Sequence, residues 1–291
     1  MSDKVNWYPG HMAKATRQIK EKLNLVDVVI ELRDARLPES SANPQLQDLL
    51  ADQPVITLLT KADLAQQSVT ARWLEYFADR ALAVSPETGQ GLKNLKNRLK
   101  DYYQEVNAER EEKGLNSRKI RAMVVGLPNV GKSTLINKLA GGSRAKTGRR
   151  PGVTRGQQWV KVSHEAELLD TPGLLWPDIK DKEHGYKLAI CGMIRPEIVD
   201  YELLGCKLIE YLLDLNPEVL EDRYNLVELA GHSYDLLADL GRNRGCLMSG
   251  GKVDRERAAR ILLQEFQDGT LGPVSLEEPP AENIAESLEE A

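Results

Sequence analysis

The first 175 residues alternate between short aliphatic runs and longer segments whose apolar residues recur with a helical period. Six runs of β-branched or aliphatic residues end at turn residues and have the length of buried strands. They cover residues 26–32, 55–59, 82–84, 120–125, 159–162 and 167–169. Residues 92–112 have the apolar spacing of a helix that crosses over and returns the chain to the sheet. The pattern predicts an α/β domain.

Beyond Pro177 the pattern is helical, which predicts a second, all-α domain. Between Pro196 and Pro217, large side chains share one helical stripe that we expect to be core. They are Leu203, Leu204, Leu208, Tyr211, Leu212 and Leu215. A last helix is predicted to begin after Asp254, whose carboxylate can cap its first turn. Its apolar and basic sides carry Ala258, Leu262 and Phe266, and Arg257, Arg260 and Gln264, respectively.

Composition restricts the class of protein. A length of 291 residues fits two domains, and 41% hydrophobic with 29% charged residues is typical of a globular chain. No apolar run approaches the ~18 residues that a membrane span needs, and the N-terminus has no apolar signal core. Three widely spaced cysteines, Cys191, Cys206 and Cys246, indicate neither a disulfide framework nor a metal site. We therefore expect a cytoplasmic protein that contacts no membrane.

The net charge of −5 hides an uneven distribution. Residues 276–291 hold six glutamates, two prolines and no base, so the remaining 275 residues carry 39 basic and 38 acidic side chains. We expect this acidic tail to be unstructured. Residues 117–161 contain eleven lysines and arginines and no acidic residue, which should attract polyanions.

Residues 126–133, with the sequence GLPNVGKS, fit the phosphate-loop pattern G-x-x-x-x-G-K-[ST]. The loop follows a predicted strand and precedes a helix, and this context disfavours the alternative of an ordinary glycine-rich turn. Lys132 would neutralise phosphate oxygens, and the Ser133 hydroxyl would ligate Mg²⁺. The candidate nucleotide-binding residues here are Asn129, Val130, Gly131, Lys132, Ser133 and Thr134. A nucleoside triphosphate is the implied ligand.

Two further segments have the order that phosphoryl transfer requires. Asp170, at the end of a predicted strand, begins the sequence DTPG and would hold Mg²⁺ through water. Gly173 would offer its backbone N–H to the γ-phosphate, so that the following segment could respond to hydrolysis. Between the motifs, Thr154 could complete the Mg²⁺ shell, although an ordinary loop threonine is a competing interpretation.

A base-recognition motif precedes the phosphate loop. Guanine presents donors at N1 and N2, which the Asp63 carboxylate could accept together while the Lys61 stem lies over the ring. These residues belong to the segment formed by Thr60, Lys61, Ala62 and Asp63, and residues 85–89, beginning with Ser85 and Pro86, would be a second base-side loop. Alone, the first segment reads more readily as a solvated turn. Together with the phosphate motifs, it favours guanine.

The combined motifs resemble the circularly permuted GTPases, in which base-recognition motifs precede the phosphate loop. The resemblance rests on residues 7–12, 34–38, 60–63, 126–133, 151–156, 170–173 and 266–272. It implies a permuted P-loop GTPase domain over residues 1–178, a smaller all-α RNA-binding domain over 179–275 and an acidic tail over 276–291. It also implies a slow GTPase, monomeric when free and stimulated by ribosomal particles. Such a protein binds the immature large (50S) subunit through ribosomal RNA and leaves after hydrolysis.

Two positions depart from the pattern of this family. Thr60 stands where asparagine is usual, and its shorter side chain puts in question both the contact to guanine N7 and the tie to the phosphate loop. Pro86 stands where alanine is usual and has no backbone N–H for guanine O6. Selection of guanine would then rest mainly on Asp63.

The group that activates water is not evident from the motifs. Leu174 occupies the place of the glutamine that orients water in Ras-type GTPases. The resemblance implies His11 as the catalytic histidine, with Lys132 at the phosphates, and His184 is the second candidate. A loop histidine that packs on the sheet or touches RNA is the competing interpretation of His11. The resemblance also implies K⁺ beside Asn129, which could instead be a turn former.

Two other functions stay open at this point. One is an RNA-binding module that uses GTP as a structural ligand, and the other is an ATP-dependent enzyme, which Asp63 disfavours. RNA contact would involve the basic stretch from Ser117, residues 144–155 and the helix bearing Arg257 and Arg260, mostly through phosphates. Some of these bases would serve GTP instead, with Arg149 and Arg150 as candidates beside Lys132.

Overall fold

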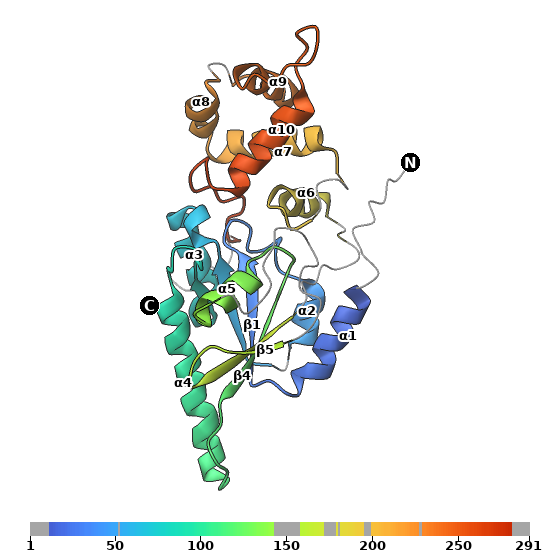
Figure 1. Ribbon diagram of the computed structural model, residues 1–291. Coiled ribbons are helices and arrows are strands. Elements are labelled where there is room, and N and C mark those ends of the chain that lie inside the picture. The colour runs from blue at the N-terminus through green and yellow to red at the C-terminus, as the bar shows by residue number, and fades with distance from the viewer. Residues whose placement is uncertain are drawn as a thin grey trace. The chain divides into compact units, whose positions relative to one another are not determined.

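The computed structural model describes residues 12–51, 53–142, 158–171, 179, 181–194, 199–226 and 229–280. The described residues form two compact units (Figure 1). Residues 12–171 together with 277–280 form the first, which we call the sheet unit. Residues 179–276 form the second, which we call the helical unit. His11, Thr154, Gly173, Leu174, Arg149 and Arg150 lie outside the described residues.

The sheet unit contains a six-stranded sheet in the order β3-β2-β1-β4-β6-β5. All neighbouring pairs are parallel except the antiparallel pair of β5 and β6. The strands are β1 (Val28–Asp34), β2 (Val55–Thr60), β3 (Ala81–Ala83), β4 (Ile120–Gly126), β5 (Gln158–Lys161) and β6 (Ala166–Asp170). The predicted α/β class is confirmed, since each of the six aliphatic runs forms a strand whose bounds differ by at most two residues.

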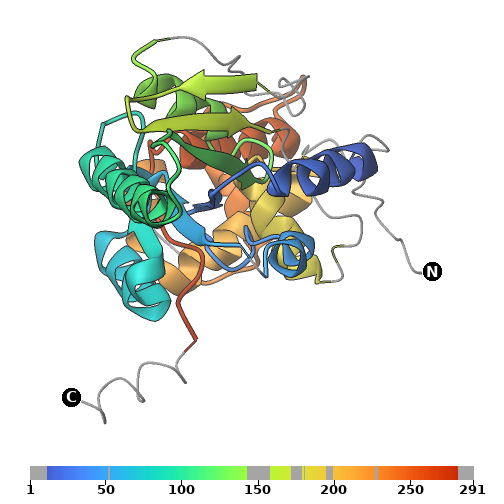
Figure 2. The ribbon, with the colours of Figure 1, turned by 90° about the horizontal axis from the view of Figure 1, so that it is seen from below.

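Helices cover both faces of this sheet. They are α1 (Met12–Leu23), α2 (Pro44–Leu49), α3 (Gln67–Phe77), α4 (Leu92–Glu112) and α5 (Lys132–Leu139), with 3-10 turns η1 (Ala62–Leu64) and η2 (Ala78–Arg80). In Figures 1 and 2, α1 and α2 lie on one side of the sheet and α4 lies on the other. All seven residues of β1 are buried, as expected of a central parallel strand with both faces covered.

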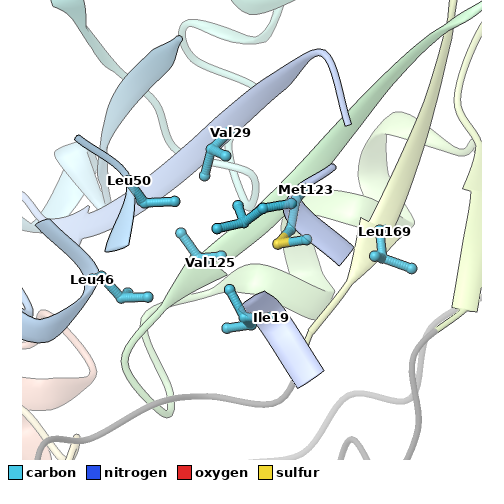
Figure 3. Close-up of a cluster of buried hydrophobic side chains, with 8 residues drawn as sticks. Ile19, Val29, Leu46, Leu50, Met123, Val125 and Leu169 are labelled. Atoms are coloured by element: carbon cyan, nitrogen blue, oxygen red, sulfur yellow. The ribbon is translucent and has the colours of Figure 1, made fainter. Parts of the chain in front are cut away.

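A cluster of apolar side chains joins the first two helices to the sheet (Figure 3). It combines Ile19 and Leu23 of α1, Leu46 of α2 and Leu50 with Val29, Met123, Val125 and Leu169 of the strands. Met123 and Val125 alternate along β4 and therefore point to the same face. This packing holds α1 and α2 against one face of the sheet. The loops that follow the carboxyl ends of the strands are not part of this cluster.

The helical unit contains α6 (Lys182–Ile190), α7 (Tyr201–Leu215), α8 (Glu218–Tyr224), α9 (Ser233–Asn243) and α10 (Arg255–Gln267). A Cβ atom at Gly205 in α7 would lie 2.7 Å from the Cβ of Ala259 in α10, so glycine permits the close contact of these helices. Asp254 caps α10 as predicted, because its carboxylate accepts from the N–H of Arg257 at 2.9 Å. Within the described residues, no helix has the length and apolar character that a bilayer crossing demands.

The predicted apolar stripe of α7 is only partly buried. Leu204, Leu208 and Leu212 are fully inaccessible, whereas Leu203 and Leu215 are 40% and 39% exposed. The buried face follows residues four apart, and Leu203 is rotated by about 100° from Leu204. The buried face of α7 is therefore narrower than the predicted stripe.

The expectation that the tail is unstructured from Glu277 onward is wrong for its first residues. Glu277 is 7% exposed, and its carboxylate accepts from the backbone N–H groups of Glu39 (2.9 Å) and Ser40 (3.1 Å) and from the Ser40 hydroxyl. The Glu277 carbonyl accepts from the Trp73 indole at 3.2 Å. Glu278 pairs with Arg72. Composition missed this because one buried carboxylate with several donors suffices to anchor a short segment.

Replacing Glu277 by alanine should lower the free energy of unfolding by about 1–3 kcal/mol, because it leaves buried donors unsatisfied. Glu278→Ala is the matched control, since an exposed ion pair contributes less than about 1 kcal/mol. Urea unfolding midpoints of both variants test this, and equal midpoints would contradict an anchoring role for Glu277.

Candidate nucleotide-binding site

The carboxyl ends of the parallel strands bring most of the described sequence-predicted site residues to one edge of the sheet. Thr60 ends β2, Gly126 ends β4 and Asp170 ends β6. Strand β1 lies between β2 and β4, so the predicted base-side and phosphate-side segments flank the same strand. Open α/β sheets bind ligands at the carboxyl ends of the strands, where the strand order reverses. Here the order reverses between β1 and β4, because β1 is followed by β2 on one side and β4 is followed by β5 and β6 on the other.

The phosphate loop connects β4 directly to α5, which begins at Lys132. Asn129 (φ 57°) and Gly131 (φ 106°) both have left-handed backbones, which asparagine and glycine tolerate best. A Cβ atom at Gly126 would lie 2.7 Å from the Leu32 carbonyl oxygen of β1, so this position requires glycine. The loop is thus a strand-to-helix turn at which a helix start meets the sheet edge, the geometry that binds phosphates.

Lys132 points into this loop. Its side chain is buried, and Nζ donates to the carbonyl oxygens of Leu127 (2.6 Å) and Gly126 (3.1 Å). Burial lowers the pKa of Lys132 to about 8, and the nearby charge of Asp170 opposes this shift. An anion bound in the loop would therefore stabilise a cation that the protein itself compensates only in part.

The predicted metal side lies next to the loop. Asp170 is 4% exposed and pairs in register with Val124 of β4. Ser133 lies half-buried in the first turn of α5. A carboxylate and a hydroxyl are hard oxygen donors of the kind that Mg²⁺ prefers, so these residues fit the ion that the motifs imply. Thr171, missed from the sequence, donates its hydroxyl to the Val124 carbonyl at 2.6 Å and joins β6 to the phosphate strand.

Thr60 ties the base side to the phosphate side. Its side chain is fully buried, and Oγ1 lies 2.7 Å from the Val130 carbonyl oxygen and 3.0 Å from that of Arg33. A hydroxyl has one proton, so it donates to one of these acceptors at a time. The sequence put the tie to the phosphate loop in question because threonine is shorter than asparagine. The structure retains the tie, since the hydroxyl reaches Val130 directly.

The two predicted base-side loops lie together because β2 and β3 are neighbours. Lys61 has a left-handed backbone (φ 54°), and the N–H of Ala62 donates to the Val84 carbonyl at 3.3 Å. Asp63 is half-buried in η1. Ser85 and Pro86 are buried, and the N–H of Gly89 closes their turn on the Ser85 carbonyl at 2.8 Å. The two base-side loops are therefore neighbours, and the Thr60 hydroxyl connects the first of them to the phosphate loop at Val130.

Two further sequence predictions concern residues outside these loops. His184 belongs to α6 of the helical unit, where its Nε2 lies 3.7 Å from an Asp181 carboxylate oxygen. The basic stretch is also less available than its sequence implied. Arg118 pairs with Asp27 at 2.6 Å, and Arg121 pairs with Glu167 at 2.9 Å. Acids from other parts of the sheet unit thus neutralise part of the charge that a count along the sequence leaves unpaired.

The fold and site define a P-loop GTPase in which the base-side motif precedes the phosphate loop along the chain. Comparison with known families agrees, since the model described as "50S ribosome-binding GTPase" matches residues 121–235. Two similar proteins are named ribosome biogenesis GTPase A. That of Priestia megaterium is 46% identical, with 94% of this chain and 97% of the relative covered. That of Thermotoga maritima is 32% identical, with 94% and 95% covered.

Solved structures give the same relationship. GDP-bound YlqF has a TM-score of 0.68 at 29% identity, covering 90% of this chain and 99% of the other. GNP-bound YlqF from T. maritima has a TM-score of 0.64 at 30% identity, covering 91% and 98%. The chain therefore belongs to the ribosome biogenesis GTPase A family. It is a GTP hydrolase and a ribosome assembly factor.

Replacing Thr60 by valine should weaken GDP binding about tenfold, because the buried Val130 carbonyl loses its donor and the phosphate loop loses its tie. Thr60→Ser keeps the hydroxyl and should bind GDP within about twofold of the parent. Titration with fluorescent GDP checks both variants. Equal affinities of the valine and serine variants would show that the hydroxyl does not maintain the site.

Proposed function

We propose that this GTPase binds the immature large (50S) ribosomal subunit through ribosomal RNA and leaves it after hydrolysis, acting in the cytoplasm as a monomer when free. The observation that carries the proposal is the placement of the site on the chain. Asp170 ends β6 beside the phosphate loop, Thr171 follows it, and Ile179 already belongs to the helical unit. The predicted switch, which would include Gly173, therefore lies along the chain between Thr171 and the first residue of the helical unit.

The roles of the site residues form part of this proposal. The Asp63 carboxylate accepts the guanine N1 and N2 donors, the Lys61 stem packs on the base, and the loop at Ser85 and Pro86 borders it. The phosphates lie against residues 129–134. Guanine selection then depends on Asp63, because Pro86 has no N–H for O6.

Hydrolysis joins a water oxygen to the γ-phosphorus and breaks its bond to the β–γ bridging oxygen, giving GDP and inorganic phosphate. Lys132 balances charge on the phosphate oxygens. Ser133, Thr154 and Asp170 would hold Mg²⁺, which supplies electrostatic stabilisation of the phosphates. Asn129, with its left-handed backbone, would hold K⁺ next to them.

Contact with RNA would use basic side chains that remain exposed. Arg257 and Arg260 lie on the exposed side of α10, as the sequence predicts. Arg260 pairs with Glu256 at 2.6 Å and stacks on Tyr201, with 3.7 Å from its guanidinium carbon to the ring centroid. Arg257 is therefore the better candidate for phosphate contact, and binding should weaken steeply with salt.

The protein with a non-hydrolysable GTP analogue should sediment with precursor large subunits and release from them with GDP. GTP turnover should rise when these particles are added, and K⁺ should support it better than Na⁺ if Asn129 binds K⁺. Binding that is the same with both nucleotides, without stimulated turnover, would favour an RNA-binding module that uses GTP as a structural ligand.

His11 is proposed to supply the group that orients or deprotonates water, since the aliphatic Leu174 cannot. His11→Ala should keep GTP affinity within about twofold but lose most of the particle-stimulated turnover, because general-base catalysis contributes about 10²–10⁴-fold. His184→Ala is the matched control and should retain stimulation. Stimulated turnover that survives in the His11 variant would assign catalysis to another group.

A further inference from the structure

A buried ion cluster lies at the end of β1, directly beside the base-side loop. Asp34 and Arg36 are 0% and 1% exposed. Arg36 donates to the Asp34 carboxylate through its backbone N–H (3.1 Å), Nε (2.9 Å) and a terminal guanidinium nitrogen (2.8 Å). Lys61 adds a second cation, with Nζ 2.8 Å from Asp34 Oδ2. One buried carboxylate thus accepts from two cations.

The charges in this cluster keep Asp34 ionised. Burial alone would raise the pKa of Asp34, but Arg36 and Lys61 together hold it far below its usual value. Arg36 by itself balances the charge of Asp34 and is held almost entirely out of solvent. The contact with Lys61 is therefore not required for neutrality, and its consequence lies in where it holds the lysine.

Lys61 is fixed at both ends. Its backbone adopts the left-handed region at φ 54° and ψ 36°, which is disfavoured for a residue with a side chain. The Lys61 carbonyl accepts from the N–H of Leu64 at 2.9 Å, and the neighbouring Ala62 N–H is bonded to Val84. At the other end, Asp34 holds the ammonium group while 23% of the side chain remains exposed. The methylene stem between these points follows a defined path.

We propose that Asp34 is a positioning residue for the guanine nucleotide, which holds the Lys61 ammonium so that the stem is already in place to pack on the base. The proposal rests on the assignment of the base site to residues 60–63. Asp34 itself contacts no nucleotide in this arrangement. Its effect comes from ordering a long, flexible side chain before the ligand arrives, which removes an entropic cost of binding.

A double-mutant cycle on Asp34→Asn and Lys61→Met tests the proposal, with fluorescent GDP titration and urea unfolding of each variant. Asp34→Asn should weaken GDP binding about 3- to 10-fold, the effect of ordering one long side chain. In the Lys61→Met background, the same substitution should change GDP affinity by less than about twofold, because its target is gone. The loss of stability that follows from weakening the Asp34–Arg36 ion pair should appear in both Lys61 backgrounds.

A matched control uses the other buried acid of the same strand. Glu31 is 4% exposed and pairs at 2.8 Å with Arg33, which lies on the same strand and not in the base-side loop. Glu31→Gln should lower stability without weakening GDP binding. If Glu31→Gln and Asp34→Asn weaken GDP binding equally, or if Asp34→Asn acts equally in both Lys61 backgrounds, the effect passes through the fold and the proposal is wrong.

Lys61→Met also provides a test if Asp34→Asn fails to fold. It keeps most of the stem but cannot be held by Asp34, so it should weaken GDP binding about as much as the expected 3- to 10-fold. Lys61→Arg keeps a cation for Asp34 and should restore most of the affinity. A Lys61→Met variant that binds GDP like the parent would overturn the proposal.

Asp63→Asn separates this inference from the proposed base site. It should shift preference from GDP toward xanthosine diphosphate, whose base presents an acceptor where guanine presents a donor. An unchanged guanine preference would remove the base site and the positioning role together. A shifted preference without coupling between Asp34 and Lys61 would remove the positioning role alone.

Discussion

The placement of β1 between β2 and β4 is the constraint on which the rest of the site depends. After β1 the chain forms β2 and β3 along one side of that strand, and it later returns to place β4 against the other side of β1. The end of β1 therefore meets both the base-side and the phosphate-side segments. Gly126 approaches the Leu32 carbonyl, and Thr60 reaches both the Arg33 and the Val130 carbonyls. The base-side motif can precede the phosphate loop along the chain because the contacts between the two segments depend on their positions in the sheet and not on their order in the sequence.

This arrangement also explains which elements could be read from the sequence. The strands were predictable because a buried parallel strand is a continuous aliphatic run, and the phosphate loop because its glycines and Lys132 have fixed spacing. The contact between Asp34 and Lys61 was not predictable, since 27 residues of chain separate them and only the pairing of β1 with β2 brings them together. The Thr60 tie depends in the same way on a carbonyl 70 residues away.

Charge counted along the sequence misled for a related reason. Residues 117–161 contain no acid, yet Arg118 and Arg121 are paired with Asp27 and Glu167 from other parts of the sheet unit. In the acidic tail, composition predicted no structure, yet the Glu277 carboxylate is buried and accepts hydrogen bonds from backbone and hydroxyl donors. Local composition describes the average solvation of a segment, whereas individual charges are decided by tertiary partners.

The two connections of the helical unit differ physically, and that difference bears on how hydrolysis could be transmitted. One connection follows Thr171, whose hydroxyl donates to the Val124 carbonyl of β4. The other ends at Glu277, which is anchored through Ser40, six residues beyond Asp34 along the chain. The segment from Asp34 to Ser41 is itself closed, because the Ser41 hydroxyl oxygen accepts from the Asp34 N–H at 3.0 Å. The second connection is therefore tied by hydrogen bonds to the segment that follows β1, whereas the first continues from the strand that ends at Asp170.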